Sequence, residues 1–176
     1  MQVNITKYPT HRWYHNFLHK VFGYKNEQAV YVQIDEWDTW SMDDTLAHIV
    51  APMLVQLRDT THSFVTVDIE DRPDHLIGTL PTPNSYEPDE FAEQAWDWVL
   101  SEMIFAFESK SKPWEEQFYS GESDITWTPI EDSNCFEVAN GPKHTFEIDM
   151  EGLKKYQDRI TNGFRLFGKY YEGLWD

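Results

Sequence analysis

Apolar residues recur at helical spacing along much of the chain, and this pattern predicts most of its secondary structure. A short helix is predicted over residues 11–22, because Trp13, Phe17 and Val21 gather on one side at about 100° per residue. Longer amphipathic helices are predicted over residues 41–58, 89–109 and 151–171. Each long helix has one apolar face, so we expect each to bury that face in a core.

Alternation of apolar and polar residues predicts several short strands between these helices. Residues 29–34 place Val30, Val32 and Ile34 on one side of a strand. Further strands are predicted over residues 64–69, 125–130, 136–138 and 145–148. The dipeptide Asn140-Gly141 favours a hairpin between the last two of these strands.

The order of the elements indicates an α+β fold with three main helices packed on a small, mostly antiparallel sheet. Helices and strands do not alternate as they do in a doubly wound parallel sheet. A chain of 176 residues can bury a substantial core, and we expect a single domain over residues 1–176. Residues 60–88 are rich in Asp, Pro, Thr and His and predict a long irregular loop within that domain.

The composition adds a strong acidic charge and many aromatic rings to this picture. Lys and Arg number 14 against 31 Asp and Glu, which gives a net charge of −17. We therefore expect no direct binding to nucleic-acid backbones or anionic membranes. The negative charge could instead attract a basic partner, bind divalent cations, imitate nucleic acid or simply keep the protein soluble. The 8 Trp residues either make a Trp-heavy core or place some indole rings in a groove or interface.

The single cysteine and the hydropathy pattern indicate a cytoplasmic protein. Cys135 has no second cysteine in the chain to pair with, which fits a reducing compartment. Its acidic neighbours disfavour a reactive thiolate. No signal-like leader is visible, and no apolar run approaches the length of a membrane span.

A turn rich in Trp and Asp joins the strand of residues 29–34 to the first long helix. Asp43 fits the first turn of that helix, where the helix dipole favours a carboxylate. Helix capping does not explain Trp37, Asp38 and Trp40, which place two large rings around a carboxylate. We therefore take these three residues as candidates for a binding surface.

Two residues are candidates for acid–base chemistry. Glu102 lies among apolar residues on its helix, so its carboxylate would be partly desolvated unless an Arg of the last helix pairs with it. A functional group and a structural ion pair are both open alternatives. His48 follows Asp44 by one helical turn, and it could act as a general base or form an exposed pair with that carboxylate.

The candidate metal ligands are carboxylates. Asp38, Asp43 and Asp124 could bind Mg²⁺ or Mn²⁺, which activates water against a phosphate ester. Positive charge collects only on the last predicted helix, where Arg159 and Arg165 are candidates for binding an anion. The sequence contains no Walker loop, no Gly-x-Gly-x-x-Gly, no Gly-x-Ser-x-Gly, no His-Glu-x-x-His and no Cys-x-x-Cys.

Three strings of the sequence are distinctive. They are residues 37–43 (WDTWSMD), 96–103 (WDWVLSEM) and 162–176 (NGFRLFGKYYEGLWD). With them, the chain from about residue 11 onward resembles a family of uncharacterised proteins of tailed bacteriophages. The resemblance implies a viral origin and action in the cytoplasm of an infected bacterium. It implies no activity, cofactor or catalytic residue.

The sequence therefore favours a phage accessory protein that works without a cofactor. It would bind a host or phage protein through an acidic, aromatic-rich surface, for example to inhibit a defence or nucleic-acid enzyme. The alternative is a metal-dependent hydrolase of nucleotides or phosphate esters that uses Mg²⁺ or Mn²⁺. A further alternative is a minor component of the virion.

Overall fold

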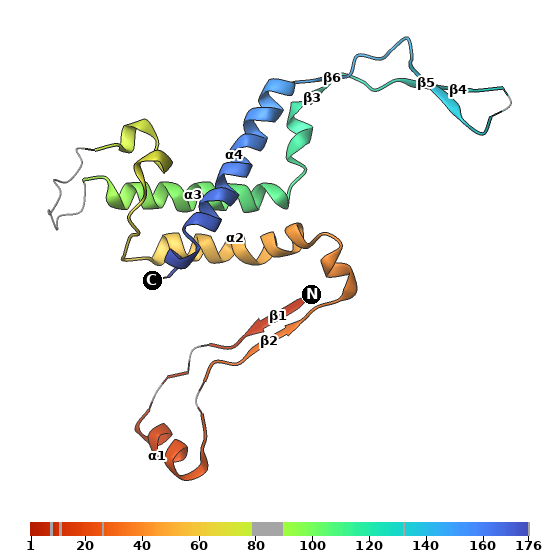
Figure 1. The fold of residues 1–176 in the computed structure, drawn as a ribbon. Helices are drawn as coiled ribbons and strands as arrows, with labels where there is room; N and C mark the ends of the chain where they lie inside the picture. The colour runs from red at the N-terminus through yellow and green to blue at the C-terminus, as the bar shows by residue number, and fades with distance from the viewer. Residues whose placement is uncertain (8, 11, 26, 79–89, 132, 176) are drawn as a thin grey trace. The chain divides into compact units, whose positions relative to one another are not determined.

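The computed structural model describes residues 1–7, 9–10, 12–25, 27–78, 90–131 and 133–175 (Figure 1). These residues form two compact units, Met1–Thr45 and Leu46–Asp176. The predicted α+β class is confirmed, because α-helices occur together with short antiparallel strand pairs. In the described part of the chain, no helix combines the length and the apolar run needed to cross a bilayer.

The first unit contains one antiparallel strand pair and one short helix. Its elements are β1 (Gln2–Ile5), α1 (Trp13–Phe22), β2 (Val30–Gln33) and the 3-10 helix η1 (Glu36–Thr39). Val3 lies opposite Val32 and Ile5 opposite Val30, so these four side chains share one face of the pair. Helix α1 ends at Gly23, whose φ of 66° few other residues adopt. None of the described residues of this unit is buried.

The core of the second unit is formed between helices. These are α2 (Met42–Thr60, of which residues 46–60 belong to this unit), α3 (Ala92–Lys110) and α4 (Met150–Lys169). All three agree with the predicted helices to within three residues at each end. The core cluster includes Ala47, Leu54, Val67, Trp96, Val99, Leu100, Met103, Phe107, Leu166 and Tyr170.

Helix α4 crosses α3 (Figure 1), and Gly163 of α4 lies against α3. A Cβ atom at Gly163 would meet the carbonyl oxygen of Glu102 and would lie 2.5 Å from Cβ of Ala106. Because Gly163 has no side chain, the two helix backbones can approach closely. At the next residue of each helix, the ring of Phe107 meets that of Phe164 edge-on, with centroids 5.0 Å apart.

The strands of the second unit pair differently from the prediction. Strand β3 (Tyr119–Ser120) pairs with β6 (Glu147–Ile148), and β4 (Ile125–Pro129) pairs with β5 (Phe136–Asn140). The predicted hairpin at Asn140-Gly141 is therefore wrong. Asn140 lies inside β5 opposite Ile125, and the Gly141 N–H donates to the Asp124 carbonyl at 2.9 Å.

The segment between α2 and α3 is irregular over residues 61–78. It contains the 3-10 helices η2 (Ile69–Asp71) and η3 (Asp74–Leu76), whereas residues 79–88 of the predicted loop lie outside the described residues. The predicted strand over residues 64–69 is wrong, because the structure assigns no strand there. Its apolar alternation has another cause, since Val67 packs into the helical core at 1% exposure.

Candidate functional site

Among the described residues, two carboxylates are buried, Asp71 and Glu102. The Asp71 side chain is 1% exposed and meets three donors from the end of α4. Its Oδ2 accepts hydrogen bonds from the Tyr170 hydroxyl at 2.7 Å and from Lys169 Nζ at 2.6 Å. Its Oδ1 accepts from the Arg165 guanidinium. Arg165 and Lys169 are four residues apart, so both lie on the face of α4 that meets Asp71.

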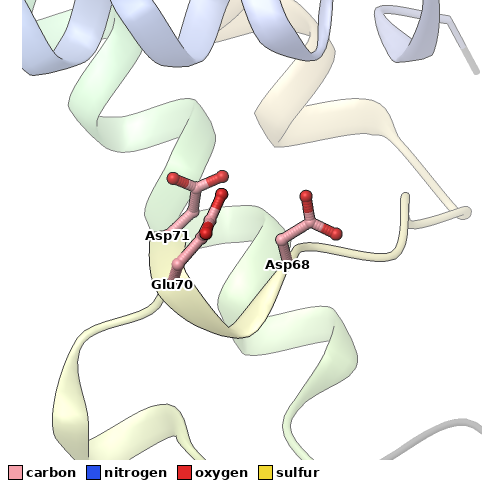
Figure 2. A group of neighbouring side chains, drawn as sticks. All are labelled: Asp68, Glu70 and Asp71. Carbon is pink, nitrogen blue, oxygen red and sulfur yellow. The ribbon is translucent and has the colours of Figure 1, made fainter.

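The 3-10 turn of η2 places three carboxylates close together. The Asp71 N–H donates to the Asp68 carbonyl at 3.0 Å and closes the turn. The Asp68 N–H in turn donates to the Tyr170 hydroxyl at 3.0 Å, which fixes the start of η2 against the end of α4. Figure 2 shows Asp68, Glu70 and Asp71 projecting from this single turn.

These carboxylates have the spacing of a cation site, and an ammonium group already lies among them. Their oxygens come within 4.8 Å of one another. Lys169 Nζ contacts Asp68 at 2.7 Å, Glu70 at 2.9 Å and Asp71 at 2.6 Å. The Lys169 ammonium therefore stands where a metal ion would bind. With Arg165, two positive charges face three negative ones, so the cluster is close to neutral without a metal.

The cluster shifts the pKa of its members in opposite directions. Burial alone would raise the pKa of Asp71, but hydrogen bonds from Lys169, Tyr170 and Arg165 outweigh it and hold that pKa below its ordinary value. Burial and the bond to the Asp71 carboxylate raise the pKa of Tyr170 to about 12. Hydrogen bonds to Asp68, Asp71 and Glu70 raise the pKa of Lys169. Asp71, Tyr170 and Lys169 therefore keep their ordinary charge states at neutral pH.

The candidate acid Glu102 forms an ion pair, which is one of the two alternatives that the sequence left open. Arg159 Nε lies 3.0 Å from Oε2 and 3.2 Å from Oε1, and a terminal nitrogen lies 2.7 Å from Oε1. The guanidinium also stands 3.7 Å from the centre of the Phe105 ring. Both carboxylate oxygens are thus occupied by the bidentate contact, and the pair joins α3 to α4.

The candidates Trp37, Asp38 and Trp40 lie together in and beside η1. The Asp35 carboxylate accepts the Trp37 N–H at 3.0 Å, and the Asp38 carboxylate accepts the Asp35 N–H at 2.8 Å. Asp38 also binds the amino group of Met1 at 2.8 Å, and these contacts lower its pKa, the Met1 bond most. The two indole rings stay in water, with Trp37 70% and Trp40 83% exposed.

The remaining candidates are not gathered into one site. His48 and Asp43 lie on exposed positions of α2. Asp124 lies at the base of the β4–β5 pair, where its Oδ2 accepts the Lys143 N–H at 2.9 Å. In the described part of the chain, no group of three potential metal ligands includes Asp38, Asp43 or Asp124.

Comparison of the chain with protein-family models, with curated proteins and with solved structures gave no match.

The second unit also contains an open pocket of about 300 Å³. It lies between the end of α2, residues 61–64 and α3, and both charged and aromatic side chains line it. The lining residues are Arg58, Thr61, His62, Ser63, Phe64, Glu93, Trp96, Asp97 and Leu100. Its volume is at the lower limit for a small-molecule site. Among the described residues, no buried polar side-chain atom lacks a hydrogen-bond partner.

Sequence reasoning missed the cluster around Asp71. It assigned residues 60–88 to a loop and took Arg165 as a possible anion-binding residue. The available signal was the run of acids at Asp68, Glu70 and Asp71 together with the collection of positive charge on the last helix. This signal is weak, because acids occur throughout so acidic a chain.

Proposed function

We propose that this protein acts by binding another protein through the surface formed by Trp37, Trp40 and the neighbouring carboxylates. The exposure of the two indole rings carries the proposal, at 70% and 83%. They belong to the unit Met1–Thr45, in which no described side chain is buried. Large exposed apolar patches mark interaction surfaces, and Trp is enriched among the residues that dominate binding energy.

The backbone that carries the two rings is held in place before any partner binds. The centroids of Trp37 and Trp40 lie 6.3 Å apart, and η1 fixes the chain between them. Two side chains close η1, since Asp35 accepts from Trp37 and Asp38 accepts from Asp35. A surface that is already ordered loses less conformational entropy on association.

The charge around the two rings favours a basic partner. Residues 26–57 contain six carboxylates and no Lys or Arg. One of them, Asp38, is paired with the Met1 amino group. Such a surface would attract a basic protein at a rate that falls as salt is added.

The partner we propose is a host or phage protein in an infected bacterium. This assignment rests on the resemblance of the sequence to proteins of tailed bacteriophages. An enzyme that binds nucleic acid contacts the phosphates with Lys and Arg, and an acidic surface with projecting indole rings would compete for such a basic surface. The protein would then act as an inhibitor without chemistry of its own.

No specific observation favours the metal-dependent hydrolase over this function. Glu102 is bound by Arg159, and the ammonium of Lys169 occupies the group formed by Asp68, Glu70 and Asp71. A role as a minor virion component stays a prediction, and detection of the protein in purified particles would test it.

The proposed function is tested by affinity capture with the tagged protein in bacterial cells, followed by purification of the captured protein. Binding of that partner is then measured by calorimetry for the wild type and for the double variant W37A/W40A. Two central Trp residues typically contribute at least about 2 kcal/mol each. We therefore expect the double variant to bind about 1000-fold more weakly, and the wild-type affinity to fall steeply with added salt.

The matched control is W175A, which removes another exposed indole from elsewhere in the chain. It is expected to leave the affinity unchanged. Both variants should keep the wild-type unfolding temperature, because the deleted rings are exposed. Equal affinity of the wild type and W37A/W40A, or loss of binding in W175A alone, would contradict the proposal.

A further inference from the structure

The β4–β5 hairpin has one apolar face that is exposed to water. Opposite residues of an antiparallel pair share a face, and the register places Trp127 opposite Val138 and Pro129 opposite Phe136. Ile125 completes this face, and Trp127, Phe136 and Val138 are each more than half exposed. The other face carries Thr126, Thr128, Glu137 and Ala139. A two-stranded hairpin with such a face is marginal in water on its own.

The register also fixes which backbone groups point away from the pair. The Gly141 N–H donates to the Asp124 carbonyl, and the Ile130 N–H donates to the Cys135 carbonyl. Bonded and non-bonded pairs alternate along an antiparallel ladder. Three residue pairs are therefore non-bonded: Ile125 with Asn140, Trp127 with Val138, and Pro129 with Phe136. The backbone N–H and C=O groups of these residues point away from the hairpin, apart from Pro129, which has no N–H.

The two outer edges of the hairpin are not equivalent. On β4 the outward positions are Ile125, Trp127 and Pro129, and a proline has no N–H to offer. On β5 the outward positions are Phe136 and Val138, followed by Asn140, and each has both a donor and an acceptor. Proline is a common means of blocking an edge against added strands. The edge of β4 is thus blunted, whereas the edge of β5 can accept a strand.

We propose that the edge of β5 binds an extended segment of a partner protein in which apolar residues alternate with Lys or Arg. Residues 119–149 contain seven carboxylates and one Lys, a net charge of −6. A second copy of this chain would bring the same charge to the contact, so electrostatics disfavour self-association and favour a basic segment. The occupant is therefore a partner strand and not another copy.

The alternation follows from the two faces of the hairpin. In a strand added beside β5, every second side chain lies on the apolar face next to Phe136 and Val138. The intervening side chains lie on the face of Glu137, where Lys or Arg gains a charge contact. Main-chain hydrogen bonds would supply affinity, and this two-sided pattern would supply selectivity. The inference does not depend on Trp37 or Trp40, so the two binding surfaces can succeed or fail separately.

The test uses the ¹⁵N-labelled full chain and three synthetic peptides of equal length. The first alternates Val and Lys, the second has the same composition in two blocks, and the third alternates Val and Glu. We expect the first peptide to bind at least tenfold more tightly than the other two. It should protect the outward N–H groups of Phe136, Val138 and Asn140 from exchange with solvent, and leave those of Ile125 and Trp127 unprotected.

Two proline variants separate the edges. V138P removes an outward donor from β5, and I125P removes one from β4 together with a comparable side chain of the same face. Neither loses a bond within the hairpin, because both positions are non-bonded. We expect V138P to weaken binding of the Val/Lys peptide at least tenfold and I125P to leave it unchanged. As a second variant with an intact backbone, E137K should weaken the Val/Lys peptide and strengthen the Val/Glu peptide.

Three outcomes would overturn the proposal. The block peptide could bind as tightly as the alternating one, which would show that binding depends only on the net charge of the peptide. The E137K variant could bind both alternating peptides as the wild type does. Protection of the β5 edge could rise with protein concentration in the absence of peptide, which would identify a second copy as the occupant.

Discussion

The Tyr170 hydroxyl donates a hydrogen bond of 2.7 Å to Oδ2 of Asp71, which lies 99 positions earlier in the chain. The same hydroxyl accepts the N–H of Asp68 at 3.0 Å. One oxygen atom thus bonds to both ends of η2. Because Tyr170 belongs to the helical core, these bonds fasten the irregular segment of residues 61–78 to the packed helices.

Replacing Tyr170 by Phe is expected to destabilise the protein while keeping the ring in the core. The variant loses a hydrogen bond to a charged carboxylate and leaves the Asp68 N–H without its acceptor. A cost of about 1–3 kcal/mol in the free energy of unfolding is expected. Urea denaturation followed by circular dichroism measures it. The control is Y171F, whose ring is exposed and which should change stability by less than about 0.5 kcal/mol.

The contribution of the Tyr170 hydroxyl should also depend on alkaline pH. The pKa of Tyr170 is raised to about 12 by burial and by Asp71, above its ordinary value of about 10. Its stabilising effect is complete below pH 10 and is lost as pH rises from about 10 to about 12. The stability difference between the wild type and Y170F should therefore shrink over this range. A constant difference would indicate that the hydroxyl does not contact the Asp71 carboxylate.

Protonation of Asp71 should account for part of the fall in the free energy of unfolding at low pH. Its folded-state pKa lies below the ordinary value of about 3.9, because donors on α4 outweigh burial. The stabilisation is present above that ordinary pKa and is lost as pH falls below it. D71N should be less stable than the wild type at neutral pH, and the gap should narrow below about pH 4. Urea titrations at several pH values measure the gap, and an unchanged gap at about pH 3 would contradict the charged contact.

The helices could be predicted from the sequence because their signal is local. The apolar positions of α2, α3 and α4 repeat at 3.6 residues, and an element of 19 or 20 residues contains this repeat several times. The pairing of Glu102 with an Arg of the last helix was foreseeable as an alternative, since a carboxylate on an apolar face needs a partner. Which of the basic residues would be the partner depends on how α4 crosses α3.

Strand pairing and the Asp71 cluster could not be predicted, because both depend on long-range contacts. Asn140-Gly141 is a good hairpin dipeptide, but Asn140 lies within the ladder, and β4 is joined to β5 between Pro129 and Phe136 instead. The alternating pattern around Val67 resembles a strand, but Val67 is apolar because it packs into the helical core and has no strand partner. Asp71 meets Tyr170 across 99 residues, and no local pattern encodes such a contact.

Removing the ammonium at position 169 should create a cation site. K169M leaves Asp68, Glu70 and Asp71 facing one another with only the Arg165 guanidinium as a counter-charge. We expect the variant to unfold at a lower temperature than the wild type and to regain stability in millimolar Ca²⁺ or Mg²⁺. The wild type, in which Lys169 fills this position, should show no such gain. Equal stabilisation of both proteins by the cation would contradict this assignment of Lys169.

Removing only Arg159 from its ion pair with Glu102 should lower the free energy of unfolding more than replacing both residues by apolar ones. The Glu102 side chain is 9% exposed and that of Arg159 is 51% exposed. R159M leaves a nearly buried carboxylate without its partner. We expect the free energy of unfolding to fall by about 1–3 kcal/mol. The loss is smaller than for a fully buried ion pair, because water reaches the arginine side. The double variant E102L/R159M should recover most of this loss, since it buries no unpaired charge.

A double-mutant cycle with E102L alone measures the coupling between the two side chains. If R159M and the double variant were equally destabilised, the loss would come from packing of the arginine stem against Phe105 and not from the ion pair.

Two glycines of α4 should respond in opposite directions to the same substitution. At Gly163 a Cβ atom would meet the backbone of Glu102 and the side chain of Ala106, so G163A must push α3 and α4 apart. At Gly168 nothing lies within 4 Å of the added atom. We expect G163A to lower the free energy of unfolding by about 1–3 kcal/mol. G168A should raise it by about 0.5–1 kcal/mol, because Ala loses less backbone entropy than Gly in a helix.

The comparison removes the effect of helix propensity, which is the same for both variants, and isolates the contact between α3 and α4. The measurement is urea unfolding of the full chain. The dependence of the free energy of unfolding on urea concentration is compared as well, because a changed slope would indicate a changed unfolded state. If G163A were as stable as the wild type, the helices would not cross at this residue. The bidentate contact of Arg159 with Glu102, one turn earlier on α4, would then also need another geometry, because both depend on the same approach of the two backbones.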